Sequence, residues 1–354
     1  MAAQGFWDRH VHSSSSTLRN MMNMKYPVLT LLLVWALLAF LIFTTRSTVF
    51  LGSPKSTTTT SIWEQNPSLC RNPSHPTLRN ESDYNTQLSS QSPVRMGKVT
   101  VLYGDVHPTY ERALRTHQLH NRIHGLREFV LRTQVVDGVW NKPAYILSVL
   151  VDELAKPDPA ARLEWLLWVD GDTVVLNPCV PPSRFLPPTN NDFDNPINAI
   201  VTRDWNGLNN GIFLLRVSPW SLELFAGIVA YRQLRPGEPL TFLDQSAMEH
   251  LLREERFRDN VAYVPQRWFN AYHALQNETL TPASIRRGDF LVHFAGRGRR
   301  REEMEFWLGV AERHAPDWEL DFWRTGYPED IGGFWEEWGR GRGRDGGVEL
   351  DGVV

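Results

Sequence analysis

The chain is poor in cysteine and has no strong excess of either charge. Its 354 residues include two cysteines, 37 lysines and arginines, and 40 aspartates and glutamates, which leaves a net charge of −3. Cys70 and Cys179 cannot build a disulfide framework, although one bridge between them in an oxidising compartment stays open. The signs are interspersed, so most of the chain lacks the electrostatic footprint of a nucleic-acid-binding protein. The length favours one main globular unit.

An uncharged apolar segment lies near the N-terminus. "YPVLTLLLVWALLAFLIF", residues 26–43, is flanked by Lys25 and Arg46 and is long enough to cross a thinner bilayer as a helix. A cleaved signal peptide has a shorter apolar core, so we favour an uncleaved anchor at residues 26–45 behind a cytosolic tail at residues 1–25. Basic residues before the segment outnumber those after it, which orients the N-terminus to the cytosol and the bulk of the chain to the lumen.

Residues 46–95 have the composition of a stem. They contain "STTTTS", several prolines and few large apolar side chains, so they cannot bury enough surface to offset the entropy of ordering. Sequons at Asn80 and Asn277 suit a secretory lumen. These features together predict a single-pass type II protein of the Golgi membrane, with its main domain in the lumen.

From Lys98 onwards, segments with the character of strands alternate with segments of helical periodicity. The expected strands are "KVTVLYGD", "FVLRTQVV", "EWLLWVD", "NAIVTRD", "GIFLLRV" and "FLVHFAG". This alternation predicts a mainly parallel α/β sheet in a domain at residues 96–324, with ligands at the carboxyl ends of the strands. Beyond it, "GRGRGRDGG" is typical of solvated disorder, so residues 325–354 are expected to form a flexible tail.

Two aspartates follow the most apolar of these strands. Asp170 and Asp172 end the run "EWLLWVDGD", and a buried carboxylate is costly unless it is paired, hydrogen-bonded or bound to a cation. Side chains two apart on a strand point to the same side, and Gly171 between them lets both carboxylates face one divalent ion. Such oxygen ligands suit Mn²⁺ or Mg²⁺. A bare Asp-x-Asp triplet also fits a turn or a cap, but the apolar strand before it favours the metal site.

Further polar residues lie at the ends of expected elements, and each has a structural as well as a functional interpretation. Short polar side chains before the "GIFLLRV" strand suit sugar hydroxyls, with a glycine for close backbone approach, or else form an ordinary turn; they are Asp204, Asn206, Asn209, Asn210 and Gly211. Asp244 and Gln245 begin an expected helix, where aspartate is commonly an N-cap. His293 ends an apolar strand, where a histidine is more often a satisfied core residue than a ligand.

Six segments occur in an order known from one family of transferases. They are "HNRIHGLREFVL", "WNKPAYI", "EWLLWVDGDTVVLNP", "LNNGIFLLR", "DQSAMEHLL" and "GDFLVHFAG". Together they resemble glycosyltransferase family 34, the galactosyl/mannosyltransferases, across roughly residues 98–310. The resemblance implies a GT-A fold, which is a Rossmann-like nucleotide-diphospho-sugar transferase domain, and an anomer-retaining transferase. It also implies Mn²⁺, or alternatively Mg²⁺, and a donor such as UDP-galactose or GDP-mannose.

The resemblance gives the candidate residues specific roles. Asp170, Asp172 and His293 are similar to the family's three metal ligands, so His293 is expected to be a ligand after all. Asp244 and Gln245 match an acidic-Gln pair beside the reacting centre and are the candidate catalytic residues. The matches that concern the donor are Tyr103, Gly104 and Asp105 for the base and ribose, Lys142 before its helix, Asn209 and Gly211 near the sugar, and Gly296 and Arg297 near the phosphates.

The chain departs from the family's pattern at two places. After His-Phe-x-Gly the family often has Cys and then Lys, whereas this chain has Arg297, Gly298 and Arg299. The cation that binds the phosphates must therefore be another residue, or it is absent. Leu243 stands where a second acidic residue can occur in the family, which weakens any inference about acceptor binding.

The leading hypothesis is a retaining α-glycosyltransferase that moves a hexose, galactose or mannose, from a nucleotide sugar to a glycan. It would be anchored in the membrane and associate with other glycosyltransferases. The alternative is a non-catalytic subunit of such a complex, which the intact Asp170, Asp172 and His293 disfavour because a scaffold needs no polar ion site. A metal-dependent hydrolase is a third interpretation, weakened because no candidate water-activating base accompanies the ion in the sequence. The sequence does not specify the sugar, the acceptor, the linkage or the oligomeric state.

Overall fold

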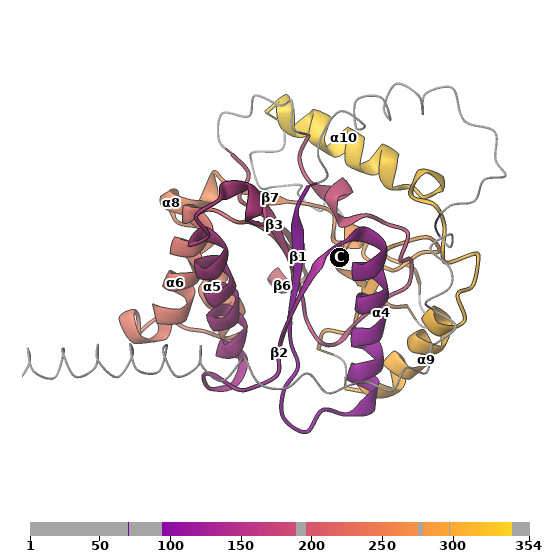
Figure 1. Cartoon of the computed structure of the whole chain (residues 1–354), viewed down its shortest axis with the longest axis horizontal. Helices are drawn as coiled ribbons and strands as arrows, with labels where there is room; N and C mark the ends of the chain where they lie inside the picture. The colour runs from indigo at the N-terminus through magenta and orange to yellow at the C-terminus, as the bar shows by residue number, and fades with distance from the viewer. Residues whose placement is uncertain (1–69, 71–93, 189–195, 275–278, 297, 342–354) are drawn as a thin grey trace, which may run out of the picture. The chain divides into compact units, whose positions relative to one another are not determined.

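The computed structural model describes residue 70 and residues 94–188, 196–274, 279–296 and 298–341. Their main feature is a six-stranded sheet in the order β2-β1-β3-β6-β5-β7, which Figure 1 shows between two groups of helices. The strands in chain order are β1 (Met96–Val101), β2 (Arg127–Leu131), β3 (Trp165–Val169), β5 (Ala199–Asp204), β6 (Gly207–Arg216) and β7 (Val261–Tyr263). The predicted α/β class is confirmed.

The strand that leads to the two aspartates is buried on both faces. Leu166 and Trp168 pack into one hydrophobic cluster, and Trp165, Leu167 and Val169 pack into another on the opposite face. Because successive side chains of a strand point to opposite faces, an unbroken apolar run such as β3 requires a core on each side. The buried strand predicted from the "EWLLWVD" run is therefore confirmed.

Helices lie on both sides of the sheet. On one side lie α5 (Asn141–Leu154), α6 (Pro219–Leu234) and α7 (Asp244–Leu252), followed by the short α8 (Glu255–Arg258), and on the other lie α4 (Pro108–His124) and α9 (Arg300–Glu312). Both α4 and α6 begin at a proline, where the missing N–H costs nothing. The side chain of Ser218 then caps α6 by accepting a hydrogen bond from the N–H of Ser221.

The sheet is mixed, because β6 runs against both of its neighbours. The pairs β1–β2, β1–β3 and β5–β7 are parallel, whereas β3–β6 and β5–β6 are antiparallel. The expectation of a mainly parallel sheet is wrong for β6, since a hairpin turn between Asp204 and Gly207 joins it to β5 without a crossover helix. The reversed direction has a consequence for the site. Residues 207–211 of β6 lie beyond the carboxyl end of β3, whose last residue pairs with Ile212.

A second sheet, of three strands, includes the strand that follows β3 in the chain. Its order is β4-β9-β8, formed by β4 (Thr173–Val175), β9 (Leu291–His293) and β8 (Ala271–Tyr272). Its apolar side chains form a third cluster with Ala113 of α4 and with Met304 and Trp307 of α9. The antiparallel register of β4 and β9 places Thr173 opposite His293.

The C-terminal region contains a helix where a flexible tail is expected. α10 spans Tyr327–Gly339 and buries Tyr327, Ile331, Trp335 and Trp338 against the cluster that also contains Trp268. These four positions recur at the helical spacing of three to four residues, so one face of α10 is apolar and packs on the domain. The prediction of a flexible tail is therefore wrong for the part up to residue 341, and residues 342–354 lie outside the described part.

The predicted anchor at residues 26–45, the cytosolic tail and both sequons lie outside the described residues. Within the described part, none of the helices combines the length and the hydropathy needed to cross a membrane. Cys70, within the predicted stem, forms a disulfide with Cys179, with the two Cα atoms 5.1 Å apart. The single bridge that the sequence left open is thus present, and it joins residue 70 to the loop after β4.

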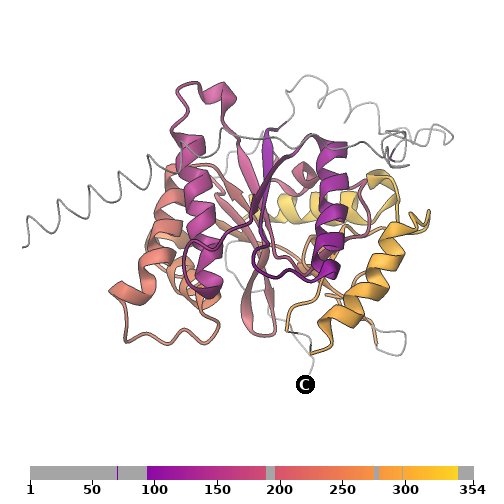
Figure 2. The same cartoon turned by 60° about the horizontal axis from the view of Figure 1, so that its bottom comes forward.

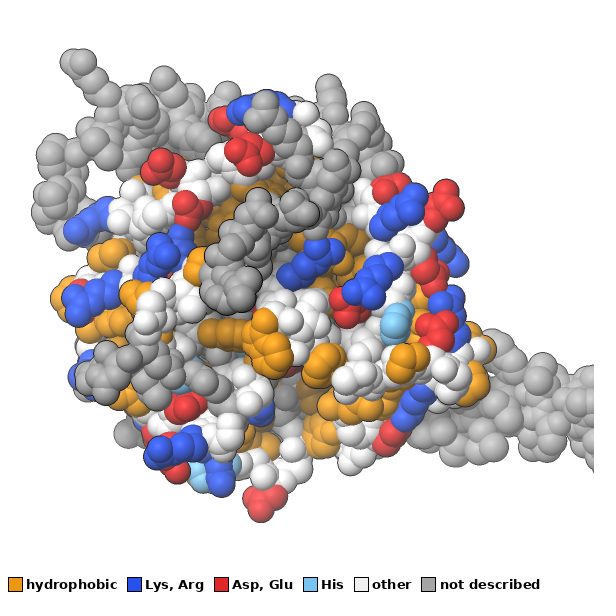
Figure 3. Space-filling model, turned by 180° about the vertical axis from the view of Figure 1, so that it is seen from behind, with side chains coloured by type: hydrophobic (Ala, Val, Ile, Leu, Met, Phe, Trp, Pro, Cys, Tyr) orange, Lys and Arg blue, Asp and Glu red, His pale blue; other side chains and the backbone are white. Residues whose placement is uncertain are grey.

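Charged side chains of both signs are spread over the surface. Figure 3 shows basic and acidic groups interspersed on one face of the molecule. Several of them are paired, as Arg112 of α4 is with Glu305 and Glu312 of α9. The described residues of that face therefore form no continuous basic surface.

A buried basic cluster lies between β1 and α4. Lys98 of β1 contacts the Nδ1 atoms of His117 and His120 on α4, at 3.4 and 2.9 Å. The Nε2 atoms of His120 and His124 lie 2.9 and 2.8 Å from the carbonyl oxygens of Val180 and Pro178, to which they donate. Burial lowers the pKa of Lys98 and of all three histidines, and the positive charge of Lys98 lowers the histidine pKa values further.

This cluster predicts that the domain loses stability as the pH falls below about 6.5, the ordinary pKa of histidine. Below that pH the histidines of the unfolded chain bind protons, whereas the buried histidines of the folded chain do not. Each buried histidine can then lower the free energy of unfolding by up to about 1.4 kcal/mol per pH unit. Asp289, whose pKa burial raises to about 6, and Asp170 act in the opposite direction. Thermal unfolding of the metal-free protein at pH 7.5 and 5.5 is expected to show a clear decrease in Tm. Replacing His120 with glutamine should reduce that decrease, and an unchanged or higher Tm at pH 5.5 would contradict the prediction.

Candidate active site

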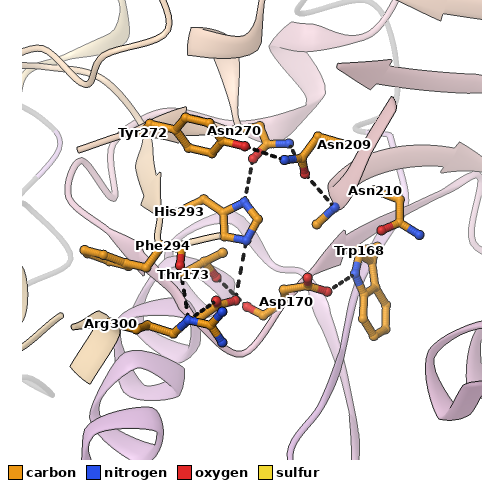
Figure 4. Close-up of polar contacts among 12 residues, drawn as sticks. Trp168, Asp170, Thr173, Asn209, Asn210, Asn270, Tyr272, His293, Phe294 and Arg300 are labelled. Atoms are coloured by element: carbon orange, nitrogen blue, oxygen red, sulfur yellow. Dashed lines mark hydrogen bonds and ion pairs between the residues drawn. The ribbon is translucent and has the colours of Figure 1, made fainter. Parts of the chain in front are cut away.

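The three predicted metal ligands meet at the carboxyl end of β3. One ligand atom from each of Asp170, Asp172 and His293 lies within 4.8 Å of the others. The register explains this meeting, because Asp172 precedes β4, His293 ends β9, and the two strands pair at Thr173 and His293. The N–H of Phe294 continues that ladder by donating to the carbonyl of Asp172, 3.1 Å away. Figure 4 shows Asp170 and the imidazole of His293 in this part of the site.

A buried asparagine fixes the orientation of His293. The Nδ2 atom of Asn270 donates to Thr202 Oγ1 and to Asn209 Oδ1, at 2.8 and 3.0 Å. Its Oδ1 atom therefore faces Nδ1 of His293, 2.7 Å away, and accepts a hydrogen bond from it. The other ring nitrogen, Nε2, faces Asp172 Oδ1 at 3.4 Å. Nε2 can carry a proton toward that carboxylate or, without the proton, offer its lone pair to a cation, which is the arrangement of a metal-binding histidine.

Asn209 holds Asn270 in place. Its Nδ2 atom donates to Asp204 Oδ2 and Tyr272 Oη, and its Oδ1 atom accepts from Asn270 Nδ2 and from the backbone N–H of Gly211, all at 2.7 to 3.0 Å. The amide has no hydrogen-bonding group left for a sugar hydroxyl. The direct sugar contact implied by the resemblance is therefore not supported, and the geometry gives Asn209 a positioning role one residue behind the histidine.

The ring of His293 explains why residue 211 is a glycine. A Cβ atom placed on Gly211 would lie 2.1 Å from Cε1 of His293 and 2.9 Å from both ring nitrogens. Contacts under about 3 Å do not occur for real Cβ atoms, so the strand can approach the ring only without a side chain. The sequence predicted that Gly211 lets another group come close to the backbone, and in the structure that group is the ring of His293.

A buried lysine connects Asp170 with the first turn of α7. Nζ of Lys142 lies 3.2 Å from Asp170 Oδ1 and 3.5 Å from Asp244 Oδ2. Burial alone would lower the pKa of Lys142, but the two carboxylates outweigh burial and raise it, so the ammonium stays charged. Burial also raises the pKa of Asp170, and Lys142 opposes that effect. Nε1 of Trp168 donates to the same Asp170 oxygen at 2.8 Å.

The candidate catalytic pair is attached to the same group of residues through Asn210. Nδ2 of Asn210 donates to Asp244 Oδ2 at 3.0 Å, and its backbone N–H donates to Gln245 Oε1 at 3.1 Å. Asp244 is not an N-cap, because it is the first residue of α7 and its side chain faces Lys142. The cap position belongs to Leu243, whose φ of 52° is unusual for a residue with a side chain.

Asp172 has a partner that the sequence did not reveal. Nε of Arg300, the first residue of α9, lies 3.0 Å from Asp172 Oδ2 and donates to the carbonyl of Phe294 at 3.1 Å. Burial would raise the pKa of Asp172, but His293 and Arg300 more than offset burial and lower it to about 2. The carboxylate is therefore ionised at any physiological pH, as a metal ligand must be.

A cavity of about 520 Å³ opens beside the two aspartates, between the end of β1 and the start of α9. Its lining residues are Val101, Leu102, Tyr103, Asp105, Val106, His107, Tyr110, Asp170, Gly171, Asp172, Arg300 and Arg301. Tyr103 and Asp105, two of the predicted donor contacts, are thus beside the metal ligands. Gly104 between them has a φ of 81°, which favours glycine. Gly296 is exposed on the chain leading to α9, and Arg297 lies outside the described residues.

Asn270, Tyr272 and Arg300 are the site residues that sequence reasoning missed. "RWFNAYH" contains one asparagine among apolar and aromatic residues, and a buried amide there must have polar partners. That signal could have identified Asn270. Arg300 had only the basic run after His293 to indicate it, and nothing in the run distinguishes Arg300 from its neighbours.

Comparison with known proteins is consistent with this geometry. The model of the galactosyl transferase GMA12/MNN10 family matches residues 180–303. The resemblance to this family is confirmed. Among its relatives, an uncharacterized α-1,2-galactosyltransferase of Schizosaccharomyces pombe is 29% identical over 49% of this chain and 58% of that protein. Xyloglucan 6-xylosyltransferase 1 of Arabidopsis thaliana is 32% identical over 38% of this chain and 32% of that protein.

The chain spans little more than half the length of the first two relatives, 58% and 52%. One solved structure that matches is a glycosyltransferase involved in the glycosylation of the major capsid of PBCV-1. It has 16% sequence identity and a TM-score of 0.45 and covers 60% of this chain and 99% of its own.

Proposed function

We propose that the protein is a metal-dependent glycosyltransferase with a GT-A fold that moves a hexose from a nucleotide sugar to a glycan. The observation that supports the proposal most strongly is the set of Asp170, Asp172 and His293 beside a cavity with two arginines. Two carboxylates and an imidazole with an available Nε2 suit Mn²⁺. When bound, such an ion supplies positive charge to a leaving diphosphate.

The arginines of α9 take the place of the family's lysine in this proposal. Arg300 and Arg301 both line the cavity. Arg301 is exposed and forms no ion pair with any residue that the structure describes. Guanidinium groups bind phosphate oxygens through charge-assisted hydrogen bonds, and the N-terminus of a helix favours anions. The diphosphate of the donor therefore lies between the metal ligands and the start of α9.

The reacting sugar lies on the opposite side of the ligands, toward α7. Lys142 forms ion pairs with both Asp170 and Asp244, whose oxygens lie 3.2 and 3.5 Å from its Nζ, and so reduces the repulsion between the two carboxylates. Gln245 has an amide nitrogen without a hydrogen bond to any described residue, so this donor is available to a sugar hydroxyl. In a retaining reaction the acceptor attacks from the face that the diphosphate leaves, and Asp244 steadies the positive charge that develops at the sugar carbon.

Galactose is the hexose that the relatives favour, because the matching family and the first relatives are named for galactosyl transfer. UDP-galactose is accordingly the first donor to test, with GDP-mannose as the second. The location we propose is the Golgi membrane with a lumenal domain. The Cys70–Cys179 bridge supports an oxidising compartment, and residues 26–43 supply the apolar run for a type II anchor.

The test uses the full chain in detergent with Mn²⁺, UDP-galactose, UDP-glucose or GDP-mannose, and oligosaccharide acceptors. Release of nucleoside diphosphate together with a longer glycan supports the proposal. Release that is independent of acceptor indicates a hydrolase instead. A protein that binds nucleotide but transfers no sugar would support the alternative of a non-catalytic subunit.

Replacing Arg301 with alanine is expected to weaken donor binding about tenfold, because one charge-assisted hydrogen bond to phosphate is lost. The effect should appear in the KM for the nucleotide sugar and in the Kd for the nucleoside diphosphate with Mn²⁺, measured by calorimetry. The matched control is Arg256→Ala, since Arg256 is exposed on α8 and pairs with Glu223. Equal nucleotide affinities for both variants and the wild type would place the diphosphate elsewhere.

A further inference from the structure

The turn between β5 and β6 presents a tryptophan at the tip of a hairpin. Asp204 pairs with Gly207, so Trp205 and Asn206 form a two-residue turn. Gly207 has a φ of 105°, a conformation that favours glycine in such turns. Figure 2 shows this hairpin, in pink, reaching past the other strands of the sheet.

The hairpin is held from both sides and is not a loose loop. The carboxylate of Asp204 accepts hydrogen bonds from the N–H of Asn206 at 2.7 Å and from Asn209 Nδ2 at 2.8 Å. On the other side, the N–H of Leu208 donates to Glu249 Oε1 of α7 at 3.3 Å. The tip is thus fixed to the same network that positions His293 and to the helix that carries the catalytic candidates.

Trp205 is 87% exposed on this fixed tip. Among the tryptophans that the structure describes, it alone is exposed, and the others are buried or half-buried. A large aromatic face in water gains nothing for folding, whereas the same face binds apolar C–H surfaces through dispersion and its negative quadrupole. A rigid, solvent-facing ring of this kind is suited to a ligand with C–H faces, such as a sugar.

The hairpin lies on the acceptor side of the site. In the sheet order, β1 and the cavity lie on one side of β3, and β6 and β5 lie on the other. A donor in the cavity leaves the space toward the hairpin to the acceptor. Trp205 is separated from Gly211 by six positions of β6 and the turn, a span of about 20 Å at the rise of a strand. That span corresponds to several sugar units.

We propose that Trp205 is a stacking platform for the distal units of an oligosaccharide acceptor. The inference rests on the proposed function, and it adds that the acceptor is an extended glycan and not a monosaccharide or disaccharide. The unit that receives the hexose lies against the reacting sugar on the face that the diphosphate leaves, and a unit further along the same chain packs its C–H face on the indole ring.

The test compares acceptors of increasing length. Homologous series of β-1,4-glucan and of α-linked mannan, from the disaccharide to the hexasaccharide, are assayed with the full chain, its donor and Mn²⁺. For the series that is used, the KM of the wild type is expected to fall with length. Trp205→Ala should raise the KM for the hexasaccharide roughly threefold to tenfold, the worth of one aromatic stacking contact, and leave the disaccharide unaffected. Trp205→Phe should restore most of the length dependence.

The control is Phe306→Ala, because Phe306 is a second exposed aromatic residue, 56% exposed, but lies on α9. It should leave the length dependence unchanged. Equal KM values for short and long acceptors in the wild type, or equal effects of Trp205→Ala on both lengths, would overturn the inference, whereas transfer to neither series would count against the proposed function. A failure of the proposed function would look different. In that case the wild type would not bind the nucleoside diphosphate in the presence of Mn²⁺.

Discussion

Asp172→Asn is expected to lower turnover on the order of a hundredfold or more, because one of two carboxylates that neutralise the cation is lost. The substitution keeps the shape of the side chain, so the loss reflects charge. Asp172 pairs with His293 and Arg300 and has a pKa of about 2. A depressed pKa means that the carboxylate stabilises the fold above its unfolded pKa, by about 2 kcal/mol at neutral pH.

Two neighbouring carboxylates without other partners would repel each other until an ion binds, so that removing one charge would stabilise the metal-free protein. In the structure each carboxylate already has a cation, Lys142 for Asp170 and Arg300 for Asp172. We therefore expect a modest decrease in the Tm of the metal-free Asp172→Asn variant, and loss of the increase in Tm that Mn²⁺ and nucleoside diphosphate produce in the wild type.

Asp259→Asn provides the matched control, since Asp259 is an exposed carboxylate that pairs with Arg258 far from the cavity. It should change neither turnover nor the ligand-induced increase in Tm. Turnover of Asp172→Asn within about threefold of the wild type, together with an unchanged ligand-induced shift, would show that the carboxylate does not hold an ion.

Local sequence patterns were sufficient to predict much of the fold and the two aspartates of the site. The apolar run of β3 requires burial on both faces, and a carboxylate at its end requires a partner. Those two facts located Asp170 and Asp172 without any structure. His293 was different, because its own surroundings in the sequence indicate a core residue. Only the order of motifs, through the resemblance, indicated a ligand, and the pairing of β4 with β9 provides the physical reason.

The remaining features depend on contacts between distant segments. The direction of β6 follows from the tight turn at Trp205 and Asn206. The dipeptide Asn206-Gly207 is a turn signal in the sequence, but a turn signal alone does not tell which strand the next one pairs with. Arg300 and Asn270 act through partners far along the chain. The helix at Tyr327–Gly339 was predictable in principle from its spaced aromatic residues, but the neighbouring glycine- and arginine-rich segment dominated the interpretation.

Gly211→Ala is expected to remove activity almost completely without contacting substrate, because the new methyl group would occupy the place of the His293 ring. The built Cβ lies 2.1 Å from Cε1 of that ring. Neither side can move freely, since Asn270 holds the ring and the carbonyl of Gly211 accepts from the N–H of Asp170 at 2.8 Å. We expect a loss of turnover of about a hundredfold or more, loss of Mn²⁺-dependent nucleotide binding, and a stability loss of about 1 to 3 kcal/mol from overpacking.

A double variant separates this cause from general damage to β6. If the clash with the ring is the reason, removing the ring removes the clash, so Gly211→Ala combined with His293→Ala should be about as stable as His293→Ala alone. The coupling energy between the two substitutions should then equal most of the stability that Gly211→Ala alone loses. If the two substitutions act independently, their stability losses simply add in the double variant. Additive losses of stability in the double variant, or normal Mn²⁺-dependent nucleotide binding by Gly211→Ala, would show that the glycine is not there to admit the histidine.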